Sequence, residues 1–144
     1  MMARWHEAIF PVCEEMNVAY VAFSPLANGI LSGKYTPDTK FEGSQDYRSG
    51  MPQYTKEGYA KAKGLLELLS RLAEEKHATM GQIFLAWMLC KKPYIVPIPG
   101  SRKAERLKEN FGAGSIVLSA AEVADIDAKL DTMNFDVFGG HTAK

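Results

Sequence analysis

The sequence contains few cysteines and no excess of charge of either sign. Its 144 residues include two cysteines, and 17 lysine and arginine residues balance 17 aspartate and glutamate residues. Balanced charge argues against a nucleic acid or an anionic membrane as a partner, because both bind basic surfaces. Cys13 and Cys90 each lie inside a helical pattern, which predicts two buried thiols in a cytoplasmic protein. A disulfide bond or a catalytic thiol is the alternative.

Long apolar runs, a secretion signal and metal-ligand spacings are absent as well. No apolar run approaches the roughly 20 residues that a membrane-spanning helix needs, and residues 1–6 lack the apolar core of a signal peptide. Histidine, cysteine and carboxylate residues are not spaced like a metal site, and His6, His77 and His141 are expected to be solvated. The length and the 47% hydrophobic content predict one globular domain over residues 1–144.

The stretch from residue 94 to residue 110 is the most informative part of the chain. Residues 94–98 form a short apolar run next to prolines, which predicts a buried strand. Gly100 then allows a sharp turn, Ser101 is a good N-cap, and a helical pattern follows from Arg102. The polar stripe of this helix is formed by Arg102, Arg106, Glu109 and Asn110.

The arginines at the start of that helix point to an anion site. Arg102 and Arg106 are one turn apart and would repel each other unless an anion lay between them. The amide groups of a helix N-terminus add a positive end of their own. A strand, a glycine turn and a helix N-terminus with two arginines are together typical of a phosphate site. The alternative is a solvated helix face on which Arg106 pairs with Glu109 or Asn110.

Two segments resemble the aldo-keto reductase family. Residues 97–110, with the pattern PIPGSRxxxRxxEN, resemble the NADP-binding segment that joins the last barrel strand of that family to its last helix. Residues 23–35, FSPLANGILSGKY, resemble the loop after the seventh strand. Both segments occur in the family's order, and the resemblance extends from the first residues to about Leu130. It is strongest to bacterial reductases and to the similar potassium-channel beta subunits.

The resemblance implies NADP as the cofactor and assigns part of it to each segment. The residues implied to surround the pyrophosphate are Ser24, Pro25, Leu26, Asn28, Gly29 and Lys34. Those implied to hold the 2′-phosphate, on a turn shaped by Gly100, are Ser101, Arg102 and Arg106. Those implied to meet the adenine are Glu109 and Asn110. Ala27 and Asn28 differ from the residues of other family members, so the resemblance does not define how Asn28 contacts the pyrophosphate.

Arg48 stands in the least regular part of the chain, residues 36–54. Pro37, Gly50 and Pro52 interrupt any helical pattern there. A long irregular loop in a compact domain is typically functional or mobile. In similar reductases an arginine of this loop reaches the cofactor when the loop closes, so Arg48 is a further cofactor-binding candidate. A merely exposed arginine is the alternative.

The remaining elements are predicted from their periodicity. Apolar residues recur at helical spacing in residues 3–16, 56–76, 79–89 and 120–131. Thr79 and Ser119 each begin a capping box, Asn17 suits the end of the first helix, and Gly112 suits a helix C-terminus. Residues 18–23 form a continuous apolar run, which predicts a strand buried on both faces. The order of elements is that of an α/β protein.

The predicted strands cannot form a stable sheet by themselves. Parallel sheets need several strands and cover on both faces. The resemblance implies the C-terminal part of a (β/α)8 TIM barrel, a fold of about 250 residues. This part would hold two parallel strands with flanking helices, and the barrel would be incomplete. The family's catalytic aspartate, tyrosine, lysine and histidine match no positions in this chain, so no catalytic residue is assigned.

The resemblance also implies a function. The chain would be the C-terminal, NADP-binding part of an aldo-keto reductase, an oxidoreductase that reduces small carbonyl compounds with NADPH in the complete protein. It would be inactive alone. The alternatives are a non-catalytic, cofactor-binding interaction module similar to channel beta subunits, and a fragment without a function of its own. The incomplete sheet predicts a partner, either a second copy of the chain or the missing N-terminal half.

Overall fold

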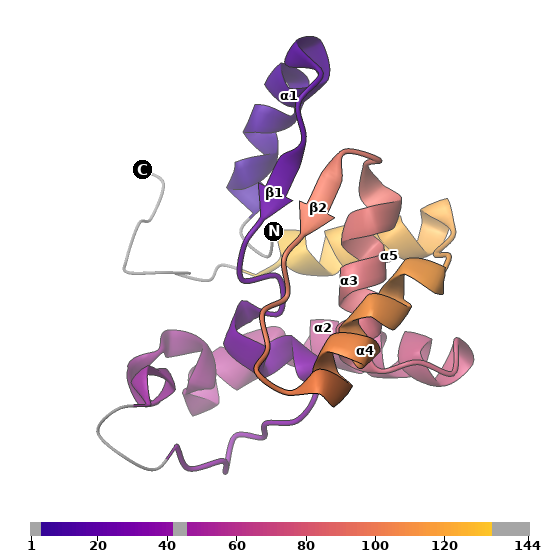
Figure 1. Ribbon diagram of the computed structural model, residues 1–144. Coiled ribbons are helices and arrows are strands. Elements are labelled where there is room, and N and C mark those ends of the chain that lie inside the picture. Colours follow the sequence, from indigo (N-terminus) through magenta and orange to yellow (C-terminus); the bar gives the residue numbers. More distant parts are fainter. Residues whose placement is uncertain (1–3, 42–45, 134–144) are drawn as a thin grey trace.

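The computed structural model describes residues 4–41 and 46–133 of the chain (Figure 1). Its α-helices and strands are α1 (Phe10–Met16), β1 (Tyr20–Ala22), α2 (Lys56–Glu75), α3 (Met80–Lys91), β2 (Ile95–Pro97), α4 (Ala104–Phe111) and α5 (Ala120–Asp131). Short 3-10 helices cover Arg4–Ile9, Ala27–Ser32, Tyr47–Gly50, Pro52–Tyr54 and Gly112–Ser115. No helix in the described ranges has both the length and the apolar composition needed to cross a membrane.

Strands β1 and β2 lie side by side and run parallel (Figure 1). The paired residues are Tyr20–Ile95, Val21–Val96 and Ala22–Pro97. Two parallel strands are therefore confirmed, although both are shorter than the predicted runs at residues 18–23 and 94–98. Because the strands are parallel, the segments that follow them both leave from the carboxyl end of the sheet.

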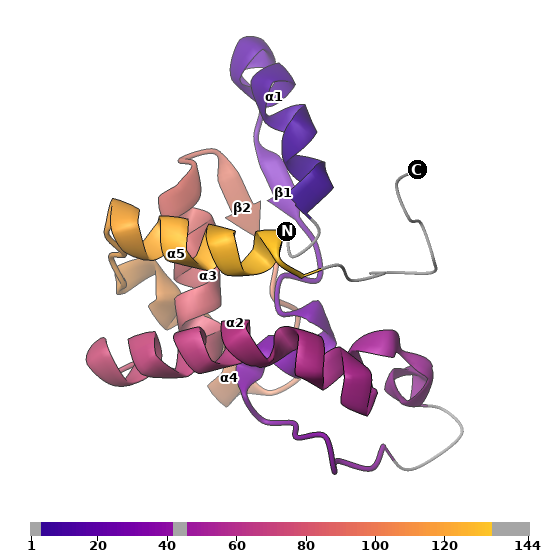
Figure 2. The same cartoon turned by 180° about the vertical axis from the view of Figure 1, so that it is seen from behind.

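Helix α3 forms the centre of the core. Figure 2 shows α2 and α5 crossing in front of α3, with β2 behind them. Phe84, Trp87 and Met88 on α3 are fully buried. Because α3 is covered on several sides, its sequence is apolar almost throughout and has no polar stripe. The helix continues to Lys91, past its predicted end at Leu89.

The two faces of the sheet have different surroundings. Ala22 and Ile95 are each 2% exposed and face the helices, whereas Val21 is 55% and Val96 is 46% exposed. Successive side chains of a strand alternate between faces, so Val21 and Val96 share the uncovered face. The prediction that residues 18–23 are buried on both faces is therefore wrong for the described part of the chain, because its helices cover one face of the sheet.

Helix ends predicted from local signals are confirmed. Thr79 and Ser119 both form capping boxes, in which the cap side chain and the third residue of the helix bond each other's backbone N–H groups. Helix α2 matches the predicted range to within one residue and begins where the Thr55 side chain accepts from the N–H of Gly58. A β-carbon at Gly58 would clash with the carbonyl oxygen of Pro52, so this tight start requires glycine.

The N-terminal segment differs from the single helix predicted over residues 3–16. A 3-10 helix precedes α1, and the change of helical period alters which side chains face inwards. Phe10 and Cys13 are buried, whereas Ile9, Val12 and Met16 are exposed. Asn17 ends α1 in the left-handed conformation, with φ of 52°, as predicted for the end of this helix.

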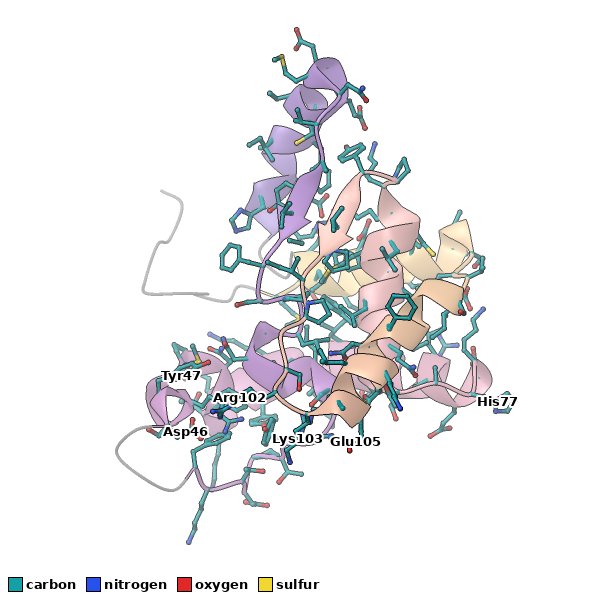
Figure 3. The ribbon with its side chains drawn as sticks, viewed as in Figure 1. Asp46, Tyr47, His77, Arg102, Lys103 and Glu105 are labelled. Carbon is teal, nitrogen blue, oxygen red and sulfur yellow. The ribbon has the colours of Figure 1, made fainter. Side chains whose placement is uncertain are left out.

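The two cysteines differ in their exposure, and so do the two described histidines. Cys13 and Cys90 are both free thiols, but Cys90 is exposed, so the prediction of two buried thiols is wrong for it. The middle of α3 is covered, whereas its C-terminal end is not. His77 is exposed at the end of α2 (Figure 3), and His6 is half-buried, which lowers its pKa. His141 lies outside the described residues.

Gly112 is the C-cap of α4, as predicted, but it does not adopt the left-handed conformation that is common for a cap glycine. Its φ of −59° is right-handed, and the chain continues into the 3-10 helix Gly112–Ser115. A β-carbon at this position would lie 2.7 Å from Nε2 of Gln82 on α3, so the Gln82 side chain would have to move away. Helices α3 and α4 therefore approach each other closely at this point.

Candidate functional site

A pocket of about 420 Å³ opens at the carboxyl end of the two strands. The segments leaving β1 and β2 form two of its sides, and the 3-10 helix Tyr47–Gly50 contributes a third. In Figure 1 both strand arrowheads point towards this region. All of the predicted cofactor-binding residues except Arg102 line the pocket, together with Ser32, Tyr35, Tyr47, Ile98 and Pro99. The structure thus gathers two segments that are about 70 residues apart in the sequence.

The loop after β1 has a strained backbone. Ser24, Ala27 and Asn28 have φ values of 44°, 47° and 59°, and Gly29 follows with 106°. Left-handed backbone costs a non-glycine residue about 1–2 kcal/mol, and such strain is concentrated at functional sites. A β-carbon at Gly29 would lie 2.8 Å from the ring of Tyr35, so glycine is required for space as well. The predicted pyrophosphate segment is therefore a tightly folded wall of the pocket.

Asn28 is the point where this wall meets the segment at residues 47–54. The hydroxyl of Tyr47 donates to Oδ1 of Asn28 at 3.2 Å, and the hydroxyl of Tyr54 donates to its backbone carbonyl at 2.7 Å. Burial raises the pKa of Tyr54, so its hydroxyl remains a donor at neutral pH. Nδ2 of Asn28 is buried and has no hydrogen-bond partner among the described residues. A donor left in this state is costly unless a ligand oxygen accepts from it.

Arg48 reaches the pocket as part of a cluster. Its Nη2 and Nε atoms lie 2.6 Å and 2.8 Å from the two carboxylate oxygens of Asp46, and its guanidinium packs 4.6 Å from the ring centre of Phe41. The bond to Arg48 lowers the pKa of Asp46, and the same bond raises the pKa of Arg48. The Arg48 side chain is 25% exposed, so it is not the merely exposed arginine that was the alternative.

The segment after β2 starts its helix later than predicted. Helix α4 begins at Ala104 with Lys103 as its N-cap, and the cap forms no side-chain hydrogen bond. Ser101 is therefore not the N-cap; its Oγ accepts from the N–H of Lys103 at 3.1 Å. Lys103 has extended backbone angles, which delay the first helical turn. As a result Arg102 is exposed and does not line the pocket, and Figure 3 shows it at the N-terminal end of α4.

Arg106 lines the pocket from the first turn of α4. Among the described residues it forms no ion pair with a carboxylate within 4 Å, and the Oε1 atom of Glu109 accepts instead from the hydroxyl of Thr79 at 3.1 Å. In the described part of the chain, Arg106 therefore pairs with neither Glu109 nor Asn110, the alternative that its spacing had left open. Arg106 stays available to an anion, as the phosphate interpretation requires.

Sequence reasoning missed some of the side chains that complete the pocket. Ser32 and Tyr35 lie within the segment that resembles the family loop, and Tyr47 is the neighbour of Arg48. Their positions beside predicted residues could have indicated them. The bond from Tyr47 to Asn28 carried no sequence signal, because it joins residues 19 positions apart through an irregular segment.

Comparison with known proteins decides the family. A sequence model described as the aldo/keto reductase family matches residues 1–131. The chain belongs to the aldo-keto reductase family. It is 37% identical over 119 residues to the aldo-keto reductase str7 of Strobilurus tenacellus, covering 83% of this chain and 35% of that protein. It is 38% identical over 132 residues to the aldo-keto reductase yakc [NADP(+)] of Schizosaccharomyces pombe, covering 91% and 38%.

Solved aldo-keto reductases agree with this assignment. The thermostable aldo-keto reductase Tm1743 superposes with a TM-score of 0.61 at 27% identity, covering 88% of this chain and 35% of that one. The glycerol dehydrogenase AKR11B4 from Gluconobacter oxydans superposes with a TM-score of 0.72 at 25% identity, covering 93% and 40%. These neighbours are TIM barrels, so the two parallel strands and their helices form part of such a barrel. The chain spans just over a third of the length of the curated relatives it matches.

Proposed function

We propose that this chain is the C-terminal, NADP-binding part of an aldo-keto reductase that reduces small carbonyl compounds with NADPH in the complete protein. The observation that carries the proposal is the single pocket shared by residues 24–34 and 100–110, with Arg106 in its lining. A relative of the chain is named as an NADP(+) enzyme. The free thiols of Cys13 and Cys90 support a reducing, cytoplasmic compartment.

The polar groups of the pocket fit a nucleotide that carries an extra phosphate. Lys34 and Arg106 supply positive charge, and the buried Nδ2 atom of Asn28 lacks an acceptor within the described residues. Glu109 bonds Thr79 through one carboxylate oxygen, which leaves the other for an amino group such as that of adenine. These residues would bind and orient the cofactor, and NADPH when bound would supply the hydride. The proton donor would come from the rest of the protein.

We expect NADP+ to bind the purified chain and to protect the pocket segments from amide exchange. Protection should appear in residues 24–34 and 100–110 and not in α5, because α5 does not line the pocket. Replacing Lys34 with glutamate should weaken binding roughly tenfold, since a charge-assisted contact contributes about 1.5–3 kcal/mol. The matched control is Lys63→Glu, which makes the same charge change on the exposed side of α2. Calorimetric titration without detectable NADP+ binding would refute the proposal.

We also expect the chain by itself not to oxidise NADPH in the presence of aldehydes. The tyrosines of the pocket are committed to structural bonds, because Tyr35 accepts from Arg48 and Tyr47 donates to Asn28. No catalytic residue is assigned to any position in this chain, so binding should occur without turnover. The measurement is NADPH absorbance with a broad aldehyde panel. Steady turnover that copurifies with the chain, and that is lost in Arg106→Ala, would contradict this expectation.

A further inference from the structure

Helix α4 carries much of the proposed nucleotide site but is weakly held by apolar packing. None of its residues is buried, and Leu107 and Phe111 are 48% and 89% exposed. The same short helix presents Arg106, Glu109 and Asn110 to the pocket. A cofactor contact depends on tenths of an ångström, so something other than a buried apolar face must fix the position of these side chains.

The N-terminus of α3 supplies that fixation through polar contacts. Nε2 of Gln82 donates to the backbone carbonyl of Glu109 at 2.8 Å, and the hydroxyl of Thr79 donates to Oε1 of Glu109 at 3.1 Å. Both contacts end on one residue of α4, so they fix its backbone and its side chain together. Gly112 makes the approach possible, because a β-carbon there would obstruct Nε2 of Gln82.

The same two side chains also cap α3, which fixes their own positions. Oε1 of Gln82 accepts from the N–H of Thr79 at 2.9 Å, and the hydroxyl oxygen of Thr79 accepts from the N–H of Gln82 at 3.2 Å. Because an amide oxygen cannot donate, the cap assigns Oε1 to Thr79 and leaves Nε2 for Glu109. The bonds to α4 therefore start from a rigid helix end.

We propose that Thr79 and Gln82 are positioning residues of the nucleotide site. Neither lines the pocket, and both act through Glu109, whose carboxylate is oriented by Thr79 and whose carbonyl is fixed by Gln82. They set the placement of α4 and thereby the affinity for the adenosine 2′-phosphate end of the cofactor. The identity of the ligand in this inference rests on the proposed function, whereas the placement of α4 can be measured without any ligand.

Gln82→Glu in the full chain tests the proposal. Glutamate keeps the capping box, as Glu122 does in α5, but it loses the Nε2 donor and brings a negative charge beside Glu109. The affinity for adenosine 2′,5′-bisphosphate should fall about tenfold, and the affinity for nicotinamide mononucleotide should stay within twofold. Thr79→Ser keeps every contact and should bind like the original chain. The mirror-image control is Glu122→Gln, which alters the capping box of α5 away from the pocket.

Amide exchange of the ligand-free chain gives a second readout. Gln82→Glu should speed exchange of residues 104–115 about tenfold and leave residues 120–131 unchanged. If Gln82→Glu binds the bisphosphate as tightly as the original chain does, or if amide exchange in α4 is unchanged in this variant, the proposal is overturned. If the original chain binds no bisphosphate, the proposed function fails, and the exchange comparison still decides whether Thr79 and Gln82 position α4. Uniformly faster exchange across α3 and α5 would also overturn it, because the effect would then be loss of general stability.

Discussion

Light scattering of the freshly purified chain is expected to give a mass above that of one chain. Val21 and Val96 pair across the sheet and lie on its uncovered face, and Ile98 is 51% exposed beside them. Within the described residues the sheet contains these two strands alone, so each has one edge without a strand partner. Exposed apolar faces and open edges favour association.

The partner in this proposal is a second copy of the chain or the remainder of an aldo-keto reductase barrel. In the purified chain only the first is present, so self-association is the expected outcome. Each valine that leaves water contributes up to about 1.5–3 kcal/mol. This contribution offsets part of the cost of association and favours a pair of chains.

A paired substitution separates association from misfolding. Val21→Lys together with Val96→Glu places opposite charges on directly paired residues, which maintains the strand pairing and makes the face polar. This variant should shift to one-chain mass with unchanged circular dichroism. Val117→Lys, at a valine that is 78% exposed outside the sheet, is the control and should associate like the original chain. A monodisperse species of one-chain mass with cooperative melting, from the original chain, would show that the incomplete sheet is stable alone.

Arg106→Ala is expected to cause the largest loss of cofactor affinity. Arg106 lines the pocket, and its guanidinium has no carboxylate partner among the described residues, so it is available to the 2′-phosphate. A hydrogen bond to a charged group contributes about 1.5–3 kcal/mol, so NADP affinity should fall tenfold to a hundredfold. NAD affinity should change less than twofold, because NAD lacks that phosphate.

Calorimetric titration of both nucleotides checks this expectation. Arg106→Lys keeps the charge without the planar two-pronged donor and should lose an intermediate amount. Arg102→Ala should lose less than Arg106→Ala, since Arg102 is exposed and does not line the pocket. Arg71→Ala, at an exposed arginine paired with Glu75 on α2, is the matched control. Equal NAD and NADP affinity in the original chain would rule out a 2′-phosphate site.

The sequence by itself determined the features that depend on neighbouring residues. Capping boxes at Thr79 and Ser119 join residues three positions apart, so their geometry is complete once the local chain is helical. The range of α2 follows from the same short-range periodicity. The family segments at residues 23–35 and 97–110 likewise carry their signal within a dozen or so positions, which is why most of the pocket-lining residues in them could be named in advance.

Tertiary structure decided which of these features meet and which side chains are covered. The strand at residues 18–23 was apolar on both faces, but whether both faces are buried depends on elements that the run itself does not encode. Arg102 does not line the pocket, because the extended backbone at Lys103 makes α4 begin later in the sequence than predicted. Glu109 bonds Thr79, which is 30 positions away, and no short-range pattern registers such a contact. Periodicity reports the faces of single elements, and only packing in three dimensions determines their neighbours.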